Sequence, residues 1–171
     1  MQKGKVSIIV PFYNCGKAIV DCLNSIKEQT YTYFEVLMID DGSNDQSKNY
    51  ALKFCVDKRF KYIYKENSGV SSTRNFGLKL VDGEYVTFID SDDVIHRDFL
   101  KYMIDTSIKS NGVIVACNHK EFYGLIEWDD DAWKKEEVVL NSTFSHKDHW
   151  EAGVVWGKLY PINCLEGIEF N

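Results

Sequence analysis

The chain has 171 residues, which is enough to bury one hydrophobic core, and we expect a single domain. Its formal net charge of −6 and the lack of any basic run argue against a nucleic-acid partner. No apolar stretch approaches the roughly 20 residues that span a bilayer, and the five cysteines have no Cys-x-x-Cys spacing, so a reducing, cytoplasmic setting is expected.

The first 30 residues predict a strand and then a helix. Apolar residues over 6–10 are typical of a buried strand, which we expect Pro11 to end because proline cannot donate a ladder hydrogen bond. Over 17–29, apolar side chains recur at the i, i+3, i+4 and i+7 spacing of an amphipathic helix, namely Ile19, Cys22, Leu23 and Ile26. We therefore expect this helix to place one face on a sheet.

Strands and helices continue to alternate as far as residue 117. The expected elements are a strand over 34–39, a helix over 46–56 with Asp45 as its N-cap, a strand over 60–64, a helix carrying Phe76, Leu78 and Leu80, a strand over 85–89, a helix capped by Asp98 with Phe99, Leu100, Met103, Ile104 and Ile108 on its apolar face, and a strand over 113–117. This alternation predicts one α/β domain with a mainly parallel sheet and flanking helices.

Beyond residue 120 the pattern weakens. Charged residues over 129–131 and 134–137 predict a solvated excursion, and 146–152 predicts a short helix. The two histidines of that segment have the i, i+3 spacing of a metal pair, but without further ligands a solvated helix face is the favoured interpretation. The apolar segment 154–160 is expected to return to the core.

Two acidic turns follow two of the predicted strands, at residues 40–43 (Asp-Asp-Gly-Ser) and 90–93 (Asp-Ser-Asp-Asp). Ligands of open α/β sheets bind beyond the carboxyl ends of the strands, where these five carboxylates would meet and repel one another. Alternate residues of an extended segment point the same way, so Asp90 and Asp92 can share a target. We expect a hard divalent metal together with a phosphate-bearing ligand. The alternative is that these aspartates only form turns and helix caps.

Arg74 and Tyr13 are the other candidates for a binding site. Arg74 follows a polar Gly- and Ser-containing loop near the start of a predicted helix, where it could bind an anion or simply pair with a surface carboxylate. Tyr13 lies in the loop after the first strand, where it could stack on a flat base or be a half-buried loop aromatic. The Gly-x-Gly-x-x-Gly and P-loop patterns are both missing from the sequence.

Taken in order, these segments resemble the family 2 glycosyltransferases of the GT-A fold. The matching segments are 6–14 (Val-Ser-Ile-Ile-Val-Pro-Phe-Tyr-Asn), 40–45 (Asp-Asp-Gly-Ser-Asn-Asp), 67–69 (Asn-Ser-Gly), 74–77 (Arg-Asn-Phe-Gly), 83–93 and 156–160 (Trp-Gly-Lys-Leu-Tyr). The resemblance implies a transferase that moves a sugar from a nucleotide-diphosphate sugar, most often a UDP-sugar. The acceptor would be a hydroxyl of a saccharide or a lipid-linked saccharide.

The resemblance also implies roles for six side chains. Pro11 and Tyr13 would line the nucleoside pocket, Asp41 would hydrogen-bond the base, Arg74 would lie near the nucleotide, Asp90 would lie by the ribose, and Asp92 would ligate Mn²⁺ or Mg²⁺. Such a metal stabilises the charge that develops on the diphosphate leaving group. The acceptor hydroxyl would lose its proton to a carboxylate base and attack in line, which inverts the anomeric carbon.

The family places its catalytic base in an acidic pair after the segment that resembles 156–160, so we expect the base to be absent from this chain, which ends at Asn171. Residues 1–171 are accordingly expected to form one GT-A-like domain. Its donor-binding portion would cover roughly 1–120, and 121–171 would form an incomplete acceptor portion. Glu166 and Glu169 are acidic, but neither is assigned as the base.

Two alternatives remain open from the sequence. The chain could be a catalytically incompetent nucleotide-sugar binder that acts through partners, or a glycoside hydrolase with two carboxylates flanking a sugar. The hydrolase predicts metal-independent hydrolysis and no nucleotide affinity. By analogy with the family, the expected setting is surface-polysaccharide assembly in the cytoplasm, with peripheral association at the inner face of the membrane as a further expectation.

Overall fold

The computed structural model describes residues 1–110, 112, 114–117, 138–140 and 155–171. The solvated excursion expected over 129–137, the short helix expected over 146–152 and its histidine pair lie outside the described residues. Within the described part, no helix is both long enough and apolar enough to cross a membrane.

One sheet holds the described strands in the order β3-β2-β1-β4-β7-β5-β6. The strands are β1 (Gln2–Phe12), β2 (Phe34–Asp40), β3 (Phe60–Tyr64), β4 (Gly83–Phe88), β5 (Ile114–Ala116), β6 (Val138–Leu140) and β7 (Lys158–Pro161). The first four pair in parallel, whereas β7 pairs antiparallel with both β4 and β5, and β5 pairs antiparallel with β6. The expected α/β architecture is confirmed, and the sheet is mixed because β7 returns beside β4 in the opposite direction.

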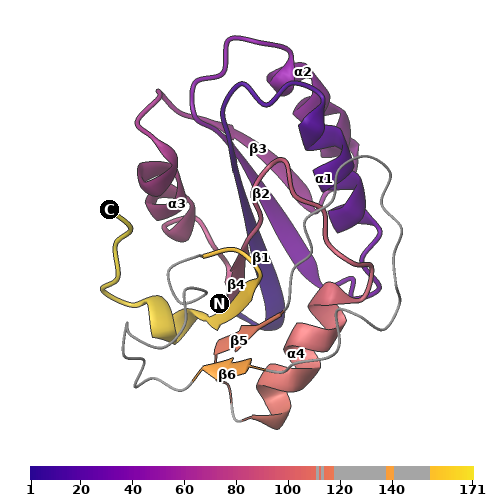
Figure 1. The fold of residues 1–171 in the computed structure, drawn as a ribbon, viewed down its shortest axis with the longest axis vertical. Coiled ribbons are helices and arrows are strands. Elements are labelled where there is room, and N and C mark those ends of the chain that lie inside the picture. The colour runs from indigo at the N-terminus through magenta and orange to yellow at the C-terminus, as the bar shows by residue number, and fades with distance from the viewer. Residues whose placement is uncertain (111, 113, 118–137, 141–154) are drawn as a thin grey trace.

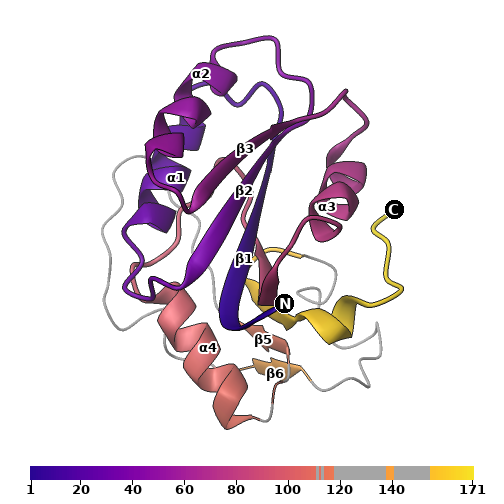
Figure 2. The ribbon, with the colours of Figure 1, turned by 180° about the vertical axis from the view of Figure 1, so that it is seen from behind.

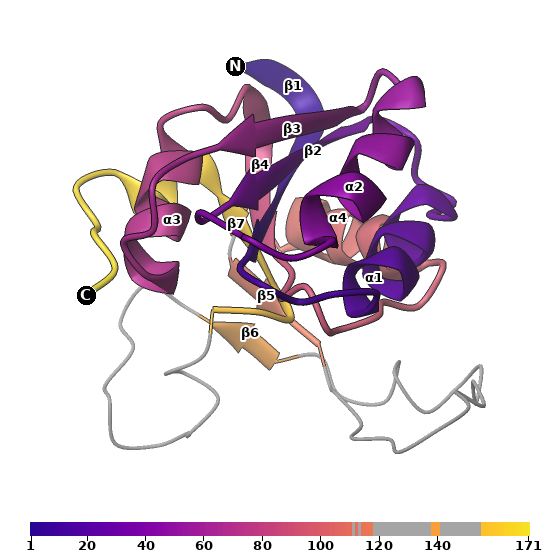
Figure 3. The same ribbon diagram turned by 90° about the horizontal axis from the view of Figure 1, so that it is seen from above.

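Helices cover both faces of the sheet. They are α1 (Ala18–Lys27), α2 (Ser47–Leu52), α3 (Val70–Leu78) and α4 (Phe99–Lys109), with 3-10 turns η1 (Lys53–Val56) and η4 (Ile162–Leu165). Helix α3 lies on one face, and α1, α2 and α4 lie on the other (Figures 1, 2 and 3). The parallel half of the sheet is therefore a three-layer structure, the usual way of burying parallel strands.

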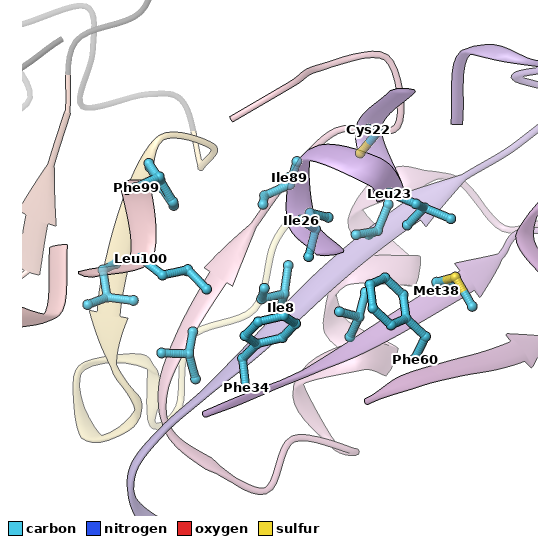
Figure 4. Packing of buried hydrophobic residues seen from close by; sticks show 14 of the residues in the cluster. Ile8, Cys22, Leu23, Ile26, Phe34, Met38, Phe60, Ile89, Phe99 and Leu100 are labelled. Carbon is cyan, nitrogen blue, oxygen red and sulfur yellow. The ribbon is translucent and has the colours of Figure 1, made fainter. Parts of the chain in front are cut away.

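The alternation of side chains along the strands produces two cores. In β2, Val36 and Met38 face the layer that contains α1 and α4, whereas Leu37 and Ile39 face the layer that contains α3. Figure 4 shows the larger core, in which aliphatic and aromatic side chains from the sheet interlock with those of α1 and α4. All of the apolar residues expected on α1 are fully buried there, namely Ile19, Cys22, Leu23 and Ile26.

The fourth helix differs from its prediction at both ends. Ile108 is 62% exposed, because the buried face of α4 continues through Ser107 instead. Asp98 occupies the N-cap position but makes no capping bond, since its carboxylate accepts a hydrogen bond from the Thr30 hydroxyl at 2.7 Å. The free Leu100 amide is instead satisfied by the side-chain oxygen of Gln29 at 2.9 Å.

Strand β1 runs through Pro11 rather than ending there. The Ile9 carbonyl accepts a hydrogen bond from Ile89 at 3.1 Å, just beyond the end of β4. Residues two apart in a strand face the same neighbour, so the missing N–H of Pro11 points past the end of β4 and costs no ladder bond. On the opposite side, the Phe12 carbonyl still accepts a hydrogen bond from Asp41 at 2.9 Å.

Candidate functional site

A pocket of about 320 Å³ opens at the edge of the sheet where β1, β2 and β4 end. We call it the carboxyl-edge pocket, and its lining residues are Pro11, Phe12, Tyr13, Asp41, Val70, Thr73, Arg74, Asp90, Ser91 and Asp92. The structure thus brings all six residues selected from the sequence into one pocket. They come from the ends of three strands and from the first turns of α3, which is the placement expected for a ligand site in an open α/β sheet.

Asp41 is a buried carboxylate that the chain itself surrounds with donors. Its Oδ1 accepts hydrogen bonds from the Lys65 ammonium and from the Ser68 amide at 3.0 Å, and its Oδ2 accepts one from the Gly69 amide at 2.9 Å. Burial alone would raise the pKa of Asp41, but the bonds from Lys65, Ser68 and Gly69 outweigh it and hold the pKa below its usual range. Asp41 therefore fixes the loop that leads into α3.

Arg74 and Asp90 form an ion pair across the pocket. A guanidinium nitrogen of Arg74 lies 2.7 Å from Oδ1 of Asp90, and only 14% of the Arg74 side chain is exposed. The Nε of Arg74 is buried and has no hydrogen-bond partner among the described residues. Because Arg74 lines the pocket, its guanidinium charge is suited to binding an anionic oxygen.

Asp92 lies at the exposed rim of the same pocket. The acidic segment is a turn rather than an extended strand, because the Asp93 amide donates to the Asp90 carbonyl at 3.0 Å. Asp90 and Asp92 are therefore not the alternate residues of an extended segment that were expected from the sequence, but the turn still places both of them at the pocket. Among the described residues, the Asp92 carboxylate has no hydrogen bond or ion pair.

The five carboxylates expected to share a cation do not act as one group. Asp40 is fully buried and lies outside the pocket, where it accepts hydrogen bonds from the Ser43 amide and the Tyr62 hydroxyl, both at 2.7 Å. Burial and the Asp40 carboxylate raise the pKa of Tyr62 above its usual value, so Tyr62 stays a donor. Asp40 is thus a structural residue, and the chain supplies counter-ions for Asp41 and Asp90 itself.

Two loops at the pocket hold each other in place. The Asn14 amide donates to the Ser43 hydroxyl at 3.0 Å, and the Asn14 side chain accepts from the Asn44 amide at 2.9 Å. Gly42, next to Ser43, has a φ of +81° and no room for a side chain, since an added Cβ would be 2.9 Å from the Asn67 nitrogen. Tyr13, which is 50% exposed, is positioned at the pocket by this arrangement.

Helix α3 reaches the pocket because it packs very closely on the sheet. At Gly77 an added Cβ would lie 2.8 Å from Ile39 and 2.9 Å from Ile9, so only glycine permits this approach. The first turns of α3 then place Thr73 and Arg74 at the edge where β1 and β2 end. The 74–77 segment that the sequence analysis selected therefore combines a pocket residue with the packing residue that positions it.

Several residues of this site are not apparent from the sequence. Lys65 is the counter-ion of Asp41, and Thr73 is a fully buried pocket residue whose hydroxyl donates to the Gly69 carbonyl at 2.9 Å. Val70 adds an apolar side chain that is 49% exposed. The pairing of Lys65 with Asp41 follows from the register of β3 on β2, in which Asp40 pairs with Tyr64, and no local sequence pattern gives that register.

Comparisons with known proteins place the chain in a family. A family model for glycosyl transferase family 2 matches residues 7–163. Glycosyltransferase GlyA of Streptococcus pneumoniae is 32% identical over 98% of this chain and 26% of its own length. EpsH of Bacillus subtilis is 31% identical over 97% of this chain and 49% of its own length. The chain therefore spans half or less of the length of these relatives.

Solved structures show the same fold. S. aureus TarS 1–349 in complex with UDP matches with a TM-score of 0.75 and 28% identity, covering 95% of this chain and 48% of TarS 1–349; its UDP-GlcNAc complex also gives 0.75. A mannosyltransferase from Pyrobaculum calidifontis, in complex with GDP-Man and Mn²⁺, matches with a TM-score of 0.62 and 25% identity over 67% of this chain and 35% of its own. This chain belongs to glycosyl transferase family 2 and has the GT-A fold.

Proposed function

We propose that this chain forms the donor-binding part of an inverting glycosyltransferase. The donor is a nucleotide-diphosphate sugar, most simply a UDP-sugar, and the acceptor is a hydroxyl of a saccharide or a lipid-linked saccharide. The observation that carries the proposal is the convergence of Pro11, Tyr13, Asp41, Arg74, Asp90 and Asp92 on one pocket at the carboxyl edge of the sheet. The UDP and UDP-GlcNAc complexes of the similar protein TarS support the choice of donor.

The pocket offers distinct surfaces to a nucleotide. Tyr13 and Val70 present exposed apolar surface that suits a flat base. Arg74 offers positive charge to the phosphates, with Asp90 holding one end of its guanidinium. Asp41 already accepts bonds from the chain at both oxygens, so we propose that it serves the base end of the pocket by holding the 65–69 loop in place.

The donor set at the rim fits a hard divalent cation. Asp92 has an oxygen-rich, exposed side chain without a partner among the described residues, and Asp90 lines the same pocket. One or two carboxylates together with substrate phosphates are the usual ligands of Mg²⁺, and Mn²⁺ accepts the same oxygen donors. We propose that Asp92, with Asp90 beside it, holds Mn²⁺ or Mg²⁺. When bound, the ion supplies Lewis-acid stabilisation of the diphosphate.

We further propose that 1–171 act as one domain, with a donor portion over roughly 1–120 and an incomplete acceptor portion over 121–171. The insertion of β7 between β4 and β5 supports this, because a late segment of the chain completes the same sheet. The biological setting that we propose is surface-polysaccharide assembly in the cytoplasm, at the inner face of the membrane. The free thiol state of all five cysteines is in keeping with a reducing compartment.

Calorimetric titration of UDP, with and without Mn²⁺, tests the proposal. We expect binding to the wild-type chain that strengthens in Mn²⁺, and we expect Asp92→Ala to remove the metal-dependent part. Asp21→Ala is a matched control, since Asp21 is an exposed aspartate of α1 that does not line the pocket. It should bind UDP as the wild type does.

The outcomes separate the competing functions. Lack of UDP binding under both conditions would contradict the choice of a UDP-sugar as the donor, whereas hydrolysis of a glycoside without metal or nucleotide would support the glycoside hydrolase. Binding that is the same in Asp92→Ala and in the wild type would remove Asp92 from the metal site. Transfer of sugar to an added acceptor would distinguish an enzyme from a nucleotide-sugar binder that acts through partners.

A further inference from the structure

A second hollow lies on the outer layer of the molecule, between α1 and the α2–η1 segment. Its volume is about 330 Å³, and its lining residues are Lys17, Val20, Asn24, Lys27, Tyr50, Lys53 and Phe54. Helices α1 and α2 lie side by side on the face of the sheet opposite α3 (Figures 1 and 3). We call this site the α1–α2 hollow, and it shares no lining residue with the carboxyl-edge pocket.

The α1–α2 hollow concentrates positive charge on an acidic chain. Lys17, Lys27 and Lys53 line it, no carboxylate does, and none of the three lysines forms an ion pair within the part of the chain that the structure describes. Asp57, which follows η1, is already bound by Arg59 through two guanidinium nitrogens at 3.1 and 2.7 Å. The charge of Lys27 also helps to hold the pKa of Asp57 below its usual value, but Asp57 lies beyond ion-pair distance of Lys27. Because the chain carries a net charge of −6, this local excess of positive charge in one hollow indicates a site for an anion.

Beneath the lysines the hollow is apolar and aromatic. Val20, Tyr50 and Phe54 are half-buried and pack against the larger core. The Lys53 ammonium lies 5.3 Å from the centre of the Tyr50 ring, a cation–π distance that keeps this charge at the hollow. Asn24 adds an amide that can donate to an oxygen. A ligand that matches these features has an anionic head and a compact apolar part.

We propose that the α1–α2 hollow binds a phosphate group attached to an apolar moiety. Lysine ammonium groups are general phosphate binders, and three of them can surround one phosphate while the apolar floor takes the attached group. A volume of about 330 Å³ lies near the lower end of the range for small-molecule sites. The phosphate is supplied either by an anionic phospholipid or by a soluble phosphate ester.

Two triple variants that remove the same amount of positive charge are compared. One replaces the three lysines of the hollow by glutamine. The control replaces three exposed lysines elsewhere by glutamine, namely Lys3, Lys79 and Lys109. All measurements are made with a chelator present, so that the proposed metal site does not contribute to phosphate binding.

Two probes then distinguish the sources of phosphate. Inorganic pyrophosphate is titrated while backbone amide signals are followed by NMR, and vesicles of phosphatidylcholine with or without phosphatidylglycerol are tested by co-sedimentation. We expect shifts at α1 and α2 amides or retention by the anionic vesicles. We expect the hollow variant to weaken that binding by roughly 100-fold, as three surface lysines contribute to a phosphate-rich surface. The control variant should bind like the wild type.

Each result has a defined meaning. Pyrophosphate shifts at Val20, Asn24 and Tyr50 that vanish in the hollow variant support a soluble phosphate ligand. Retention by anionic vesicles alone supports a phospholipid head group. Equal loss of binding in both variants would show a general charge effect and overturn the proposal. The absence of binding to either probe would overturn it as well, and so would shifts confined to the carboxyl-edge pocket.

Discussion

A carboxylate is buried beside a lysine at each end of the parallel strands, but the two ends differ in whether the neighbouring polar groups all have partners. At the amino ends, the Glu35 carboxylate accepts hydrogen bonds from the Ser7 hydroxyl at 2.7 Å and from the Asp82 amide at 3.0 Å. It also accepts one from the Lys61 ammonium at 2.7 Å, and the Lys5 ammonium lies 3.4 Å from the same carboxylate. Burial alone would raise the pKa of Glu35, but the bonds from Lys61 and Ser7 hold it below its usual range. The chain itself therefore supplies the partners of this carboxylate, and we call such a network closed.

At the carboxyl ends the network is only partly closed. Asp41 is satisfied by the chain, but the buried Nε of Arg74 has no partner among the described residues and the Asp92 carboxylate is exposed without one. Tyr13 and Val70 also leave apolar surface in contact with solvent. The difference shows that a buried charge alone does not mark a site. Polar groups left unsatisfied beside a pocket do, because a ligand can satisfy them.

The largest expected effect is on stability, at the amino ends of the parallel strands. Glu35→Ala should lower the free energy of unfolding by about 3 kcal/mol, because it leaves the Ser7 hydroxyl and the Asp82 amide without their acceptor. It also removes one of the two carboxylates beside the largely buried Lys5, which keeps only Asp82 at 3.2 Å. Urea denaturation measures the loss. Glu28→Ala, at an exposed position of the same chemistry, is the control and should cost less than about 0.5 kcal/mol.

The native fraction of the Glu35→Ala protein should still bind UDP with unchanged affinity. If Glu35→Ala weakened UDP binding at a temperature where the variant is folded, the two ends of the sheet would be energetically coupled. The contrast between a purely structural end and a ligand-binding end would then fail.

Asp41→Ala should have a smaller effect on stability and a larger one on binding. Loss of the bonds from Ser68, Gly69 and Lys65 should cost about 2 kcal/mol in urea denaturation, since the 65–69 loop is exposed enough for water to replace some of them. UDP affinity, measured by calorimetry, should fall by roughly tenfold because the loop that leads to Arg74 is no longer fixed. If the free energy of unfolding fell as expected but the UDP affinity did not change, Asp41 would have a purely structural role, like Glu35.

Much of this arrangement could be predicted from the sequence, for reasons visible in particular residues. The apolar periodicity of α1 fixed its buried face, because burial of Ile19 and Ile26 depends only on helical geometry. The pocket could be located because acidic turns follow β2 and β4, and parallel strands bring their carboxyl ends together. Both patterns involve residues close together in the sequence, so they can be recognised without knowledge of distant contacts.

What the sequence did not reveal depends on distant contacts. The pairing of Lys65 with Asp41 needs the register of β3 on β2, and the pairing of Arg74 with Asp90 needs the close approach of α3 to the sheet. The failed cap at Asp98 has the same origin, since a side chain 71 residues away in sequence, Gln29, satisfies the Leu100 amide. No window of neighbouring residues contains that information.

The smallest expected effect comes from two buried threonines, whose hydroxyls differ only in whether they have a partner. Thr73, at the open end, donates to the Gly69 carbonyl at 2.9 Å, so Thr73→Val should destabilise the protein by about 1 kcal/mol. Thr87 in β4 has a buried hydroxyl without a partner in the part of the chain that is described, so Thr87→Val should be neutral or stabilising by up to about 1 kcal/mol. Each replacement keeps the side-chain shape, so urea denaturation of the two variants isolates the hydrogen bond. Equal effects of the same sign would mean that packing, rather than a hydrogen bond to the hydroxyl, decides the outcome. Polar groups with and without a partner would then not differ in their effect on stability.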